Sequence, residues 1–194
     1  MAQLTLPLFP LNTVLFPGGL LPLRVFEPRY LEMVCECLTH DAPFGVCLIR
    51  SGSEVGKAAD TFPVGTLSRI GDWDRGPDGL LEVIARGEQR FRIHSTRVRA
   101  DQLVTARVSV LPAEPEEFVP PHLRRLPELL DRILEQAGEP FSELTRYPED
   151  ATWVGCRLAE WLPLPMLEKQ ELLELTDPLE RLERLHERLP DLLR

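Results

Sequence analysis

The sequence lacks the features that mark exported and membrane-spanning proteins. No run of apolar residues approaches the roughly 18 consecutive positions that a membrane-spanning helix needs. The opening segment, MAQLTLPLFP, has neither the positive stretch nor the plain apolar core of a signal peptide. We therefore expect a cytoplasmic protein with no membrane association.

Cysteine and histidine are also sparse and do not form a metal-binding pattern. Without an export signal, we expect reduced thiols at the four cysteines, which are Cys35, Cys37, Cys47 and Cys156. Zinc sites use C-x2-C pairs with a second pair of ligands, whereas only one residue separates Cys35 from Cys37. The histidines are scattered along the chain. We expect no structural metal and no cofactor.

The residues that ATP-driven or serine-based catalysis requires are missing. The chain has no G-x4-G-K-[ST] loop, whose backbone amides and lysine would hold the phosphates of ATP. Lysine occurs only as Lys57, in a polar loop near Ser51 and Ser53, and as Lys169, in an acidic segment. Neither lysine offers the base in fixed geometry that a serine nucleophile needs. We therefore expect a protein that is not an enzyme.

The negative charge is unevenly distributed along the chain. The formal net charge is -9 at pH 7. Residues 1–113 contain 12 Lys and Arg against 12 Asp and Glu, whereas residues 114–194 contain 10 against 19. The whole acidic excess therefore lies in the second part, which indicates two differently built halves.

The first part of the chain has the pattern of short strands. Apolar residues alternate with others in several short runs, for example 81–85 and 104–110, and a Gly-Pro-Asp-Gly turn lies at 76–79. One apolar stripe with helical spacing begins after Pro28 and predicts a single helix. Many short strands with one helix predict a closed or nearly closed antiparallel barrel over residues 1–111.

The hydrophobic pattern changes in the last part of the chain. Residues 112–121 contain four prolines and three glutamates, which is typical of a linker. Apolar residues then recur with helical spacing over 122–194 and predict a helical bundle. Asp150 and Asp177 are each expected to cap a helix N-terminus. The sequence therefore predicts an α+β chain, with a barrel, a linker and a helical bundle.

Several segments resemble the substrate-binding domain of Lon-type proteases. Residues 6–34, LPLFPLNTVLFPGGLLPLRVFEPRYLEMV, contain P-L-F-P-L, an L-F-P-G turn and an F-E-x-R-Y segment. The likeness continues in FGVCLI at 44–49, VGTLSRI at 64–70, the G-x-x-R-F of 87–91, RLAEWLPL at 157–164 and KQELLEL at 169–175. The resemblance therefore extends over nearly the whole chain, although none of these segments is a catalytic motif.

The resemblance implies a fold and a function. The implied fold is a PUA-like antiparallel β-barrel followed by a C-terminal helical bundle, without the ATPase and protease domains of complete Lon. The implied function is a non-catalytic module that binds unfolded or apolar polypeptide segments, as an adaptor or regulator in bacterial protein quality control. A complete Lon protease is a further implied partner.

A sensor of a small ligand or nucleotide, using a pocket in the barrel, is an alternative from a different class. The shape of the pocket discriminates between the two functions. An open apolar groove favours a peptide, and a closed polar cavity favours a small ligand.

Three phenylalanines are candidates for a polypeptide-binding groove. Aromatic side chains are common anchors of such surfaces, so Phe9, Phe16 and Phe26 are predicted to line it. Packing in the core is the ordinary role of phenylalanine, and both interpretations stay open at this level.

Three neighbouring residues, Glu27, Arg29 and Tyr30, are the other candidates for the peptide-binding site. One interpretation is a polar anchor inside the groove. The other is a salt bridge and an aromatic contact that fix the corner between a strand and the predicted helix.

An arginine-rich stretch raises the question of nucleic-acid binding. Six arginines lie between residues 86 and 107, together with Glu88 and Asp101. Nucleic-acid binding normally shows a broad basic surface and a high isoelectric point, but the pI of this chain is about 5.0. The arginines also alternate with apolar residues, as in any half-exposed strand. We do not expect a nucleic-acid partner.

Overall fold

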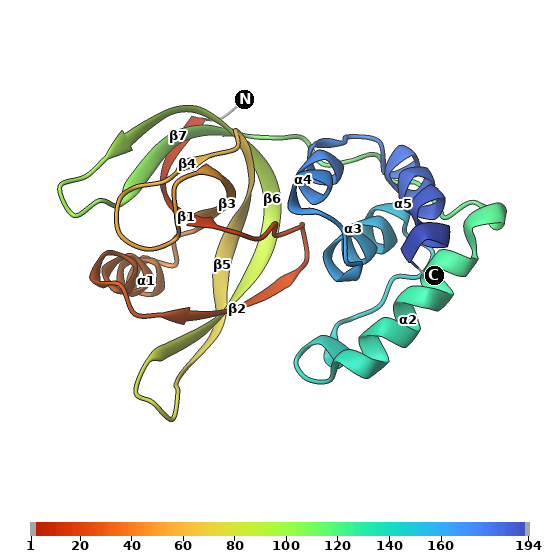
Figure 1. Ribbon diagram of the computed structural model, residues 1–194, viewed down its shortest axis with the longest axis horizontal. Helices are drawn as coiled ribbons and strands as arrows, with labels where there is room; N and C mark the ends of the chain where they lie inside the picture. Colours follow the sequence, from red (N-terminus) through yellow and green to blue (C-terminus); the bar gives the residue numbers. More distant parts are fainter. Residues whose placement is uncertain (1–2, 193–194) are drawn as a thin grey trace. The chain divides into compact units, whose positions relative to one another are not determined.

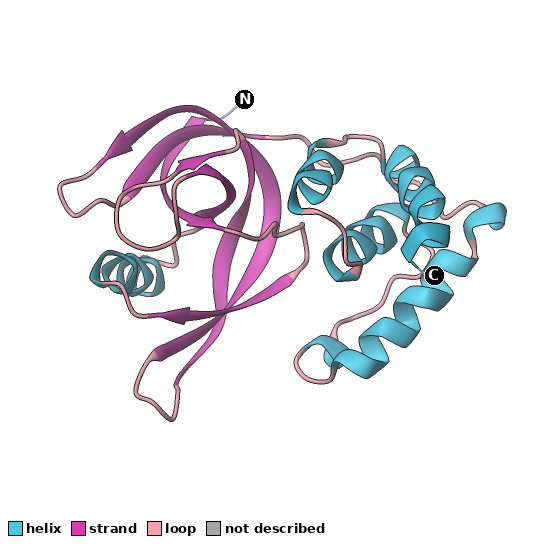
Figure 2. Ribbon diagram, viewed as in Figure 1, coloured by secondary structure: helices cyan, strands magenta, loops and turns pink. Residues whose placement is uncertain are grey.

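The chain divides into two compact units, Met1–Pro112 and Ala113–Arg194. The computed structural model describes residues 3–192, so the outermost positions of the two expected domains, 1–2 and 193–194, lie outside the described residues. Figure 2 shows that the first unit is built mainly of strands and the second of helices. This arrangement confirms the predicted α+β class.

Within its described residues, 3–112, the first unit contains strands and a single α-helix, as the sequence pattern predicts. In chain order, its elements are β1 (Gln3–Leu11), β2 (Leu20–Val25), α1 (Pro28–His40), β3 (Phe44–Ser51), β4 (Asp60–Thr61), β5 (Val64–Arg75), β6 (Leu81–Val98) and β7 (Val104–Val110). Helix α1 starts with Pro28 in its first turn, and the residue that caps its C-terminus, Asp41, has a left-handed backbone with φ of 47°. The proline therefore marks the start of this helix, as the sequence indicates.

A closed ring is formed by β1, β3, β5, β6 and β7 (Figure 1). The order is β1-β7-β6-β5-β3, and β3 pairs back with β1. All of these pairings are antiparallel except the closing one, in which Leu8 to Leu11 of β1 run parallel to Gly45 to Leu48 of β3. The barrel is thus not wholly antiparallel. A parallel pair needs a long crossover, and the segment that contains β2 and α1 supplies it.

Strand β2 lies outside this ring and extends the sheet at one edge. It pairs with β6 alone among the described strands, with Leu20 opposite Arg86 and Val25 opposite Leu81. Gly87 follows the paired segment of β6, and a Cβ atom there would collide with the carbonyl oxygen of Phe16. The glycine therefore lets the Pro17-Gly18-Gly19 turn pack closely on the sheet, with Gly18 N–H donating to Gly87 O at 2.8 Å.

The second unit is helical throughout its regular elements. These are η1 (Pro121–Leu123), α2 (Arg125–Ala137), η2 (Phe141–Glu143), α3 (Ala151–Trp161), α4 (Met166–Glu174) and α5 (Pro178–Leu192). Helix α3 contacts α2, α4 and α5, so it forms the centre of the bundle. No helix within residues 3–192 is long and apolar enough to span a membrane.

Two aspartates cap helices of the bundle, as the sequence predicts. The Asp150 side chain accepts a hydrogen bond from Trp153 N–H at 3.1 Å at the start of α3. The Asp177 side chain accepts from Leu179 N–H at 2.9 Å and from Glu180 N–H at 3.3 Å at the start of α5. Each carboxylate satisfies backbone donors that have no partner within the helix.

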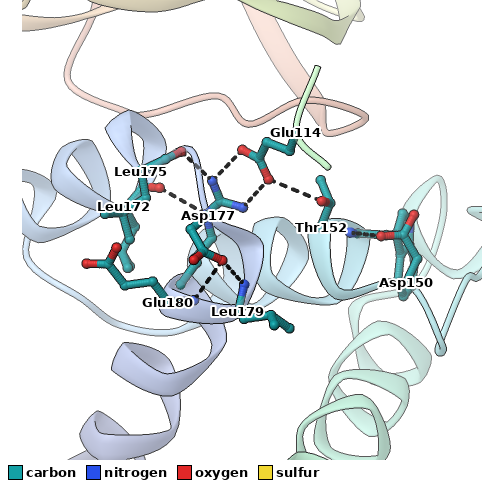
Figure 3. A network of polar contacts seen from close by, with 10 residues as sticks. Glu114, Asp150, Thr152, Leu172, Leu175, Asp177, Leu179 and Glu180 are labelled. Atoms are coloured by element: carbon teal, nitrogen blue, oxygen red, sulfur yellow. Dashed lines mark hydrogen bonds and ion pairs between the residues drawn. The ribbon is translucent and has the colours of Figure 1, made fainter. Parts of the chain in front are cut away.

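The proline-rich segment that we expected to be a linker contributes to the second unit. Ala151 N–H donates to Glu117 O at 2.9 Å, and Val119 N–H donates to Glu149 O at 3.0 Å. The Glu114 side chain is buried and accepts hydrogen bonds from Thr152 and Arg181 (Figure 3). Much of the segment after Ala113 is therefore fixed to the helices by backbone and side-chain bonds.

Candidate functional site

A surface pocket of about 170 Å³ in the barrel unit brings together four of the six predicted site residues. These four are Phe9, Phe26, Glu27 and Tyr30. The other lining residues are Leu11 of β1, Pro22, Leu23, Arg24 and Val25 of β2, and Glu54 and Val55 of the loop between β3 and β4. Strands β1 and β2, the start of α1 and one loop thus form the walls of what we call the barrel pocket.

The aromatic residues of the barrel pocket differ in exposure. Phe9 and Tyr30 are stacked, with ring centroids 4.2 Å apart and planes inclined by 23°, and both are buried. Phe26 is 53% exposed, and Val55 on the opposing loop is 54% exposed. The pocket therefore has a fixed aromatic floor and exposed apolar side chains at its rim.

The third phenylalanine does not contribute to this surface. Phe16 is fully buried and is absent from the lining of the barrel pocket. Its position follows from the turn at residues 17–19, which packs against Gly87. Of the three candidates, Phe16 has the core role, and Phe26 has the exposure that contact with a partner requires.

Arg29 lies beneath the loop that forms one wall of the pocket. Its side chain is 4% exposed, and it donates to Gln102 O at 3.0 Å and to Glu54 O at 3.3 Å. It also forms an ion pair with Glu27 at 3.1 Å and stacks over the Tyr30 ring at 4.6 Å. A guanidinium group with several donors in a fixed plane suits this joining of three chain segments. Arg29 is therefore a positioning residue, not a surface for a partner.

The carboxylates of the pocket accept hydrogen bonds that fix the loop between β3 and β4. The Glu27 carboxylate accepts from Gly56 N–H at 3.3 Å, and the Glu54 carboxylate accepts from Asn12 N–H at 2.6 Å. Burial raises the pKa of Tyr30, and the positive charge of Arg29 partly offsets that effect. Tyr30 therefore stays a neutral phenol at physiological pH and serves as an aromatic wall.

The remaining walls of the barrel pocket have only a weak signal in the sequence. The loop residues Glu54 and Val55 have no distinctive motif, and only the fold places them beside Phe26. Pro22 is different, because proline within a strand indicates an edge strand, whose nitrogen has no partner to bond. Strand β2 pairs on one side only among the described residues, in agreement with that rule.

The arginine-rich stretch does not form one continuous exposed surface. Arg90 is only 4% exposed. Arg99 forms an ion pair with Asp101 at 3.1 Å, and Arg69 on the neighbouring strand forms one with Glu88 at 3.0 Å. Acidic side chains thus neutralise part of the stretch. Within residues 3–192, no three His, Cys, Asp or Glu side chains are grouped so that they could hold a metal ion.

Comparison with known families decides the relationship of this chain. The family model of the ATP-dependent protease La (LON) substrate-binding domain matches residues 5–191 of this chain. The chain belongs to this family. A solved structure, the Lon N-terminal domain protein from Xanthomonas campestris, is 40% identical and has a TM-score of 0.78, with 94% of this chain and 96% of that one covered.

A second solved structure shares the fold at lower identity, and curated proteins are similar in sequence. The N-terminal domain of the Mycobacterium avium complex Lon protease has a TM-score of 0.67 at 17% identity, with 96% of this chain and 98% of that one covered. The Lon protease of Cytophaga hutchinsonii is 28% identical over 190 residues, which are 91% of this chain and 23% of that protein. Protein cereblon of Danio rerio is 32% identical over 111 residues, or 55% of this chain and 25% of cereblon. The chain thus spans about a quarter of the length of these curated relatives.

Proposed function

We propose that this chain is a non-catalytic module that binds unfolded or apolar polypeptide segments through the barrel pocket. The observation that carries the proposal is the juxtaposition of exposed Phe26 and Val55 above the stacked Phe9 and Tyr30 rings. Exposed apolar side chains over a preformed pocket are typical of a surface that contacts a partner. Membership in the Lon substrate-binding family supports the same ligand class.

Strand β2 adds a second means of holding an extended chain. Pro22 cannot donate a hydrogen bond, so its backbone side belongs on the free edge of β2, away from β6. The two-residue period of a strand then directs the backbone groups of Leu20 and Arg24 to that same edge. A peptide segment running beside β2 would pair with these groups and insert an apolar side chain beside Phe26.

The alternative, a small-ligand or nucleotide sensor, has less support. A pocket for a free nucleotide would require donors for phosphate groups and a cavity that encloses most of the ligand. The barrel pocket has a mainly apolar lining with the exposed Phe26 and Val55 at its rim. Its basic Arg24 is paired with Asp78 and Glu82, and its acidic Glu27 and Glu54 would repel phosphates. This shape and charge favour a polypeptide.

The cellular role proposed here is that of an adaptor or regulator in cytoplasmic protein quality control. The proposal includes association with a complete Lon protease, since a polypeptide-binding module without catalysis acts by delivering or withholding substrates. Binding of any one segment is expected to be weak, in roughly the micromolar to millimolar range, because docking costs an extended chain conformational entropy.

The test is fluorescence anisotropy of a labelled peptide of alternating leucine and serine, with the whole 194-residue chain. Phe26→Ala should weaken binding about tenfold with little change in melting temperature, since Phe26 is half exposed. Trp73→Ala is the matched control, because Trp73 is 58% exposed and does not line the pocket. Equal effects of the two substitutions would refute the proposed site. Binding that falls steeply with salt and prefers RNA would refute the ligand class.

A further inference from the structure

The helical unit contains its own pocket, of about 380 Å³, formed by residues 116–118 and 146–150. We call it the Phe118–Tyr147 groove, after its two most exposed aromatic residues. All of its lining residues belong to the second unit. It is therefore a separate feature from the barrel pocket, and no part of the proposed function depends on it.

Backbone hydrogen bonds hold the two segments of the groove side by side. Phe118 and Asp150 form an antiparallel bridge. On either side of it, Val119 N–H donates to Glu149 O at 3.0 Å and Ala151 N–H donates to Glu117 O at 2.9 Å. The groove is thus preformed, which lowers the entropy that a ligand would have to offset on binding.

The two aromatic side chains of the groove are largely exposed to solvent. Phe118 is 79% exposed and Tyr147 is 54% exposed. Tyr147 makes an edge-to-face contact with Trp153, with ring centroids 6.2 Å apart, so only part of its ring is covered. Exposed rings in a concave surface are typical of binding sites. Because these two rings are largely exposed, they contribute little to the stability of the helical unit.

Negative charge surrounds these rings. Glu116, Glu117 and Glu149 line the groove and are exposed, and none of the three has an ion-pair partner among the described side chains. The one basic residue of the lining, Arg146, is already engaged, since it lies 3.1 Å from Asp131 and 3.7 Å from Glu135. A ligand with positive charge would therefore meet unopposed carboxylates beside aromatic faces.

From this combination, we propose that the Phe118–Tyr147 groove binds polypeptide segments in which arginine or lysine alternates with apolar residues. The apolar side chains pack against Phe118. The cationic side chains form ion pairs with Glu117 and Glu149 and lie against the Tyr147 ring, where the negative face of the ring attracts a cation. Acidic segments and nucleic acids are repelled by the same carboxylates.

The test compares three labelled synthetic peptides by fluorescence anisotropy with the full chain. One alternates arginine with leucine, one alternates glutamate with leucine, and one alternates arginine with serine. The arginine–leucine peptide should bind at least about tenfold more tightly than either of the others, because only it satisfies both the charge and the rings. Its affinity should fall as salt concentration rises.

Substitutions then locate the binding. Phe118→Ala should weaken the arginine–leucine peptide about tenfold. The double substitution Glu117→Gln and Glu149→Gln should weaken it and flatten its dependence on salt. Leu167→Ala is the control, because Leu167 is 61% exposed in the same unit and lies outside the groove. All of these variants should keep the wild-type melting temperature, since each replaced side chain is exposed.

Three results would overturn the proposal. The first is a glutamate–leucine peptide that binds as tightly as the arginine–leucine peptide. The second is a loss of arginine–leucine binding in Phe26→Ala but not in Phe118→Ala, which would assign that peptide to the barrel pocket. The third is self-association in analytical ultracentrifugation that disappears in Phe118→Ala, which would make a second copy of this chain the occupant. Failure of the leucine–serine peptide to respond to Phe26→Ala would refute the proposed function alone.

Discussion

Glu114 and Arg181 form a buried two-point ion pair that joins the start of the second unit to its last helix. Arg181 Nη1 lies 2.7 Å from Glu114 Oε2, and Arg181 Nη2 lies 2.6 Å from Glu114 Oε1. The side chains are 1% and 5% exposed. Arg181 also donates to the carbonyl oxygens of Leu172 at 2.9 Å and Leu175 at 2.9 Å. The pair therefore satisfies a charge that would otherwise be buried without compensation (Figure 3).

We predict that Glu114→Gln strongly destabilises the second unit. The substitution leaves the Arg181 charge buried without its carboxylate. We expect the free energy of unfolding to fall by about 3–5 kcal/mol. The control is Glu180→Gln, which removes an ion pair with Arg184 whose side chains are nearly half exposed and should cost about 0–1 kcal/mol. Urea unfolding followed by circular dichroism measures both. Similar costs for the two variants would contradict the assigned role of the buried pair.

A second prediction concerns close packing between strands of the barrel. A Cβ atom on Gly65 would lie 2.5 Å from Val46 O and 2.6 Å from Cys47 Sγ, so Gly65→Ala must displace backbone. We expect the free energy of unfolding to fall by roughly 1–3 kcal/mol, as for other overpacked cores. Gly71→Ala is a matched control in the same strand, because its nearest neighbour, Ile84 O, is 3.5 Å away. Thermal unfolding should separate the two variants, and equal melting temperatures would rule out this packing.

A third prediction concerns Arg29 and the loop wall of the barrel pocket. Arg29→Lys keeps the charge but cannot reach Gln102 O, Glu54 O and the Glu27 carboxylate together. We expect the free energy of unfolding to fall by about 2 kcal/mol. We also expect faster hydrogen exchange at residues 54–58.

The control for Arg29→Lys is Arg24→Lys, whose side chain is 59% exposed and should tolerate the change. Hydrogen exchange measured by mass spectrometry reports on the loop directly. An unchanged exchange rate in Arg29→Lys would show that the loop is held by other contacts.

The buried thiols give a prediction for alkaline pH. Burial raises the pKa of Cys47 from 9.0 to about 12, and a hydrogen bond from Thr61 opposes this only in part. Because the folded pKa is above the ordinary value, the stability contributed by the neutral thiol is fully present below pH 9.0 and is lost as the pH rises toward 12. Cys47→Ala should therefore lose less stability than wild type between these limits.

Urea unfolding midpoints measured across this pH range show how steeply the stability of each protein falls with pH. Cys35→Ala is the control because Cys35 is exposed. In the native protein, a thiol reagent should modify Cys35 quickly and leave Cys37, Cys47 and Cys156 protected until unfolding. Parallel pH profiles for wild type and Cys47→Ala would contradict the assigned pKa.

The last prediction is that the purified chain hydrolyses neither ATP nor unfolded casein. The sequence has no phosphate-binding loop. Lys169 Nζ donates to Glu160 O at 2.6 Å, and Lys57 lies exposed in the loop between β3 and β4. Phosphate release and cleavage of labelled casein are the measurements. Turnover that Ser51→Ala, Ser53→Ala or Lys57→Met abolishes would disprove this expectation.

The elements themselves were largely predictable, because their signals are local. The period of two before residue 111 and the period of 3.6 after it reflect which faces of strands and helices are buried. Pro28 marks a helix start because its ring fixes φ near the helical value. Asp150 and Asp177 mark helix starts through hydrogen bonds to residues only two or three positions away. Such features depend on neighbours in sequence, so a sequence pattern can contain them.

The candidate site could be predicted only in part. Phe9, Phe16 and Phe26 have the same chemistry, yet their exposed fractions are 7%, 0% and 53%. Those values depend on the close approach of Gly87 to the turn after Phe16 and on the loop that carries Val55. No local pattern encodes these contacts.

By itself, the sequence determined the order of strands and helices, the lack of a phosphate-binding loop and the likeness to Lon substrate-binding domains. Tertiary structure alone decided that β1 closes the barrel by a parallel pairing with β3 and that Glu114 belongs to the helical unit. It also decided which aromatic side chains remain available to a partner. The physical reason is that burial and ion pairing depend on residues far apart in the chain, as Glu114 and Arg181 show, whereas periodicity and capping do not.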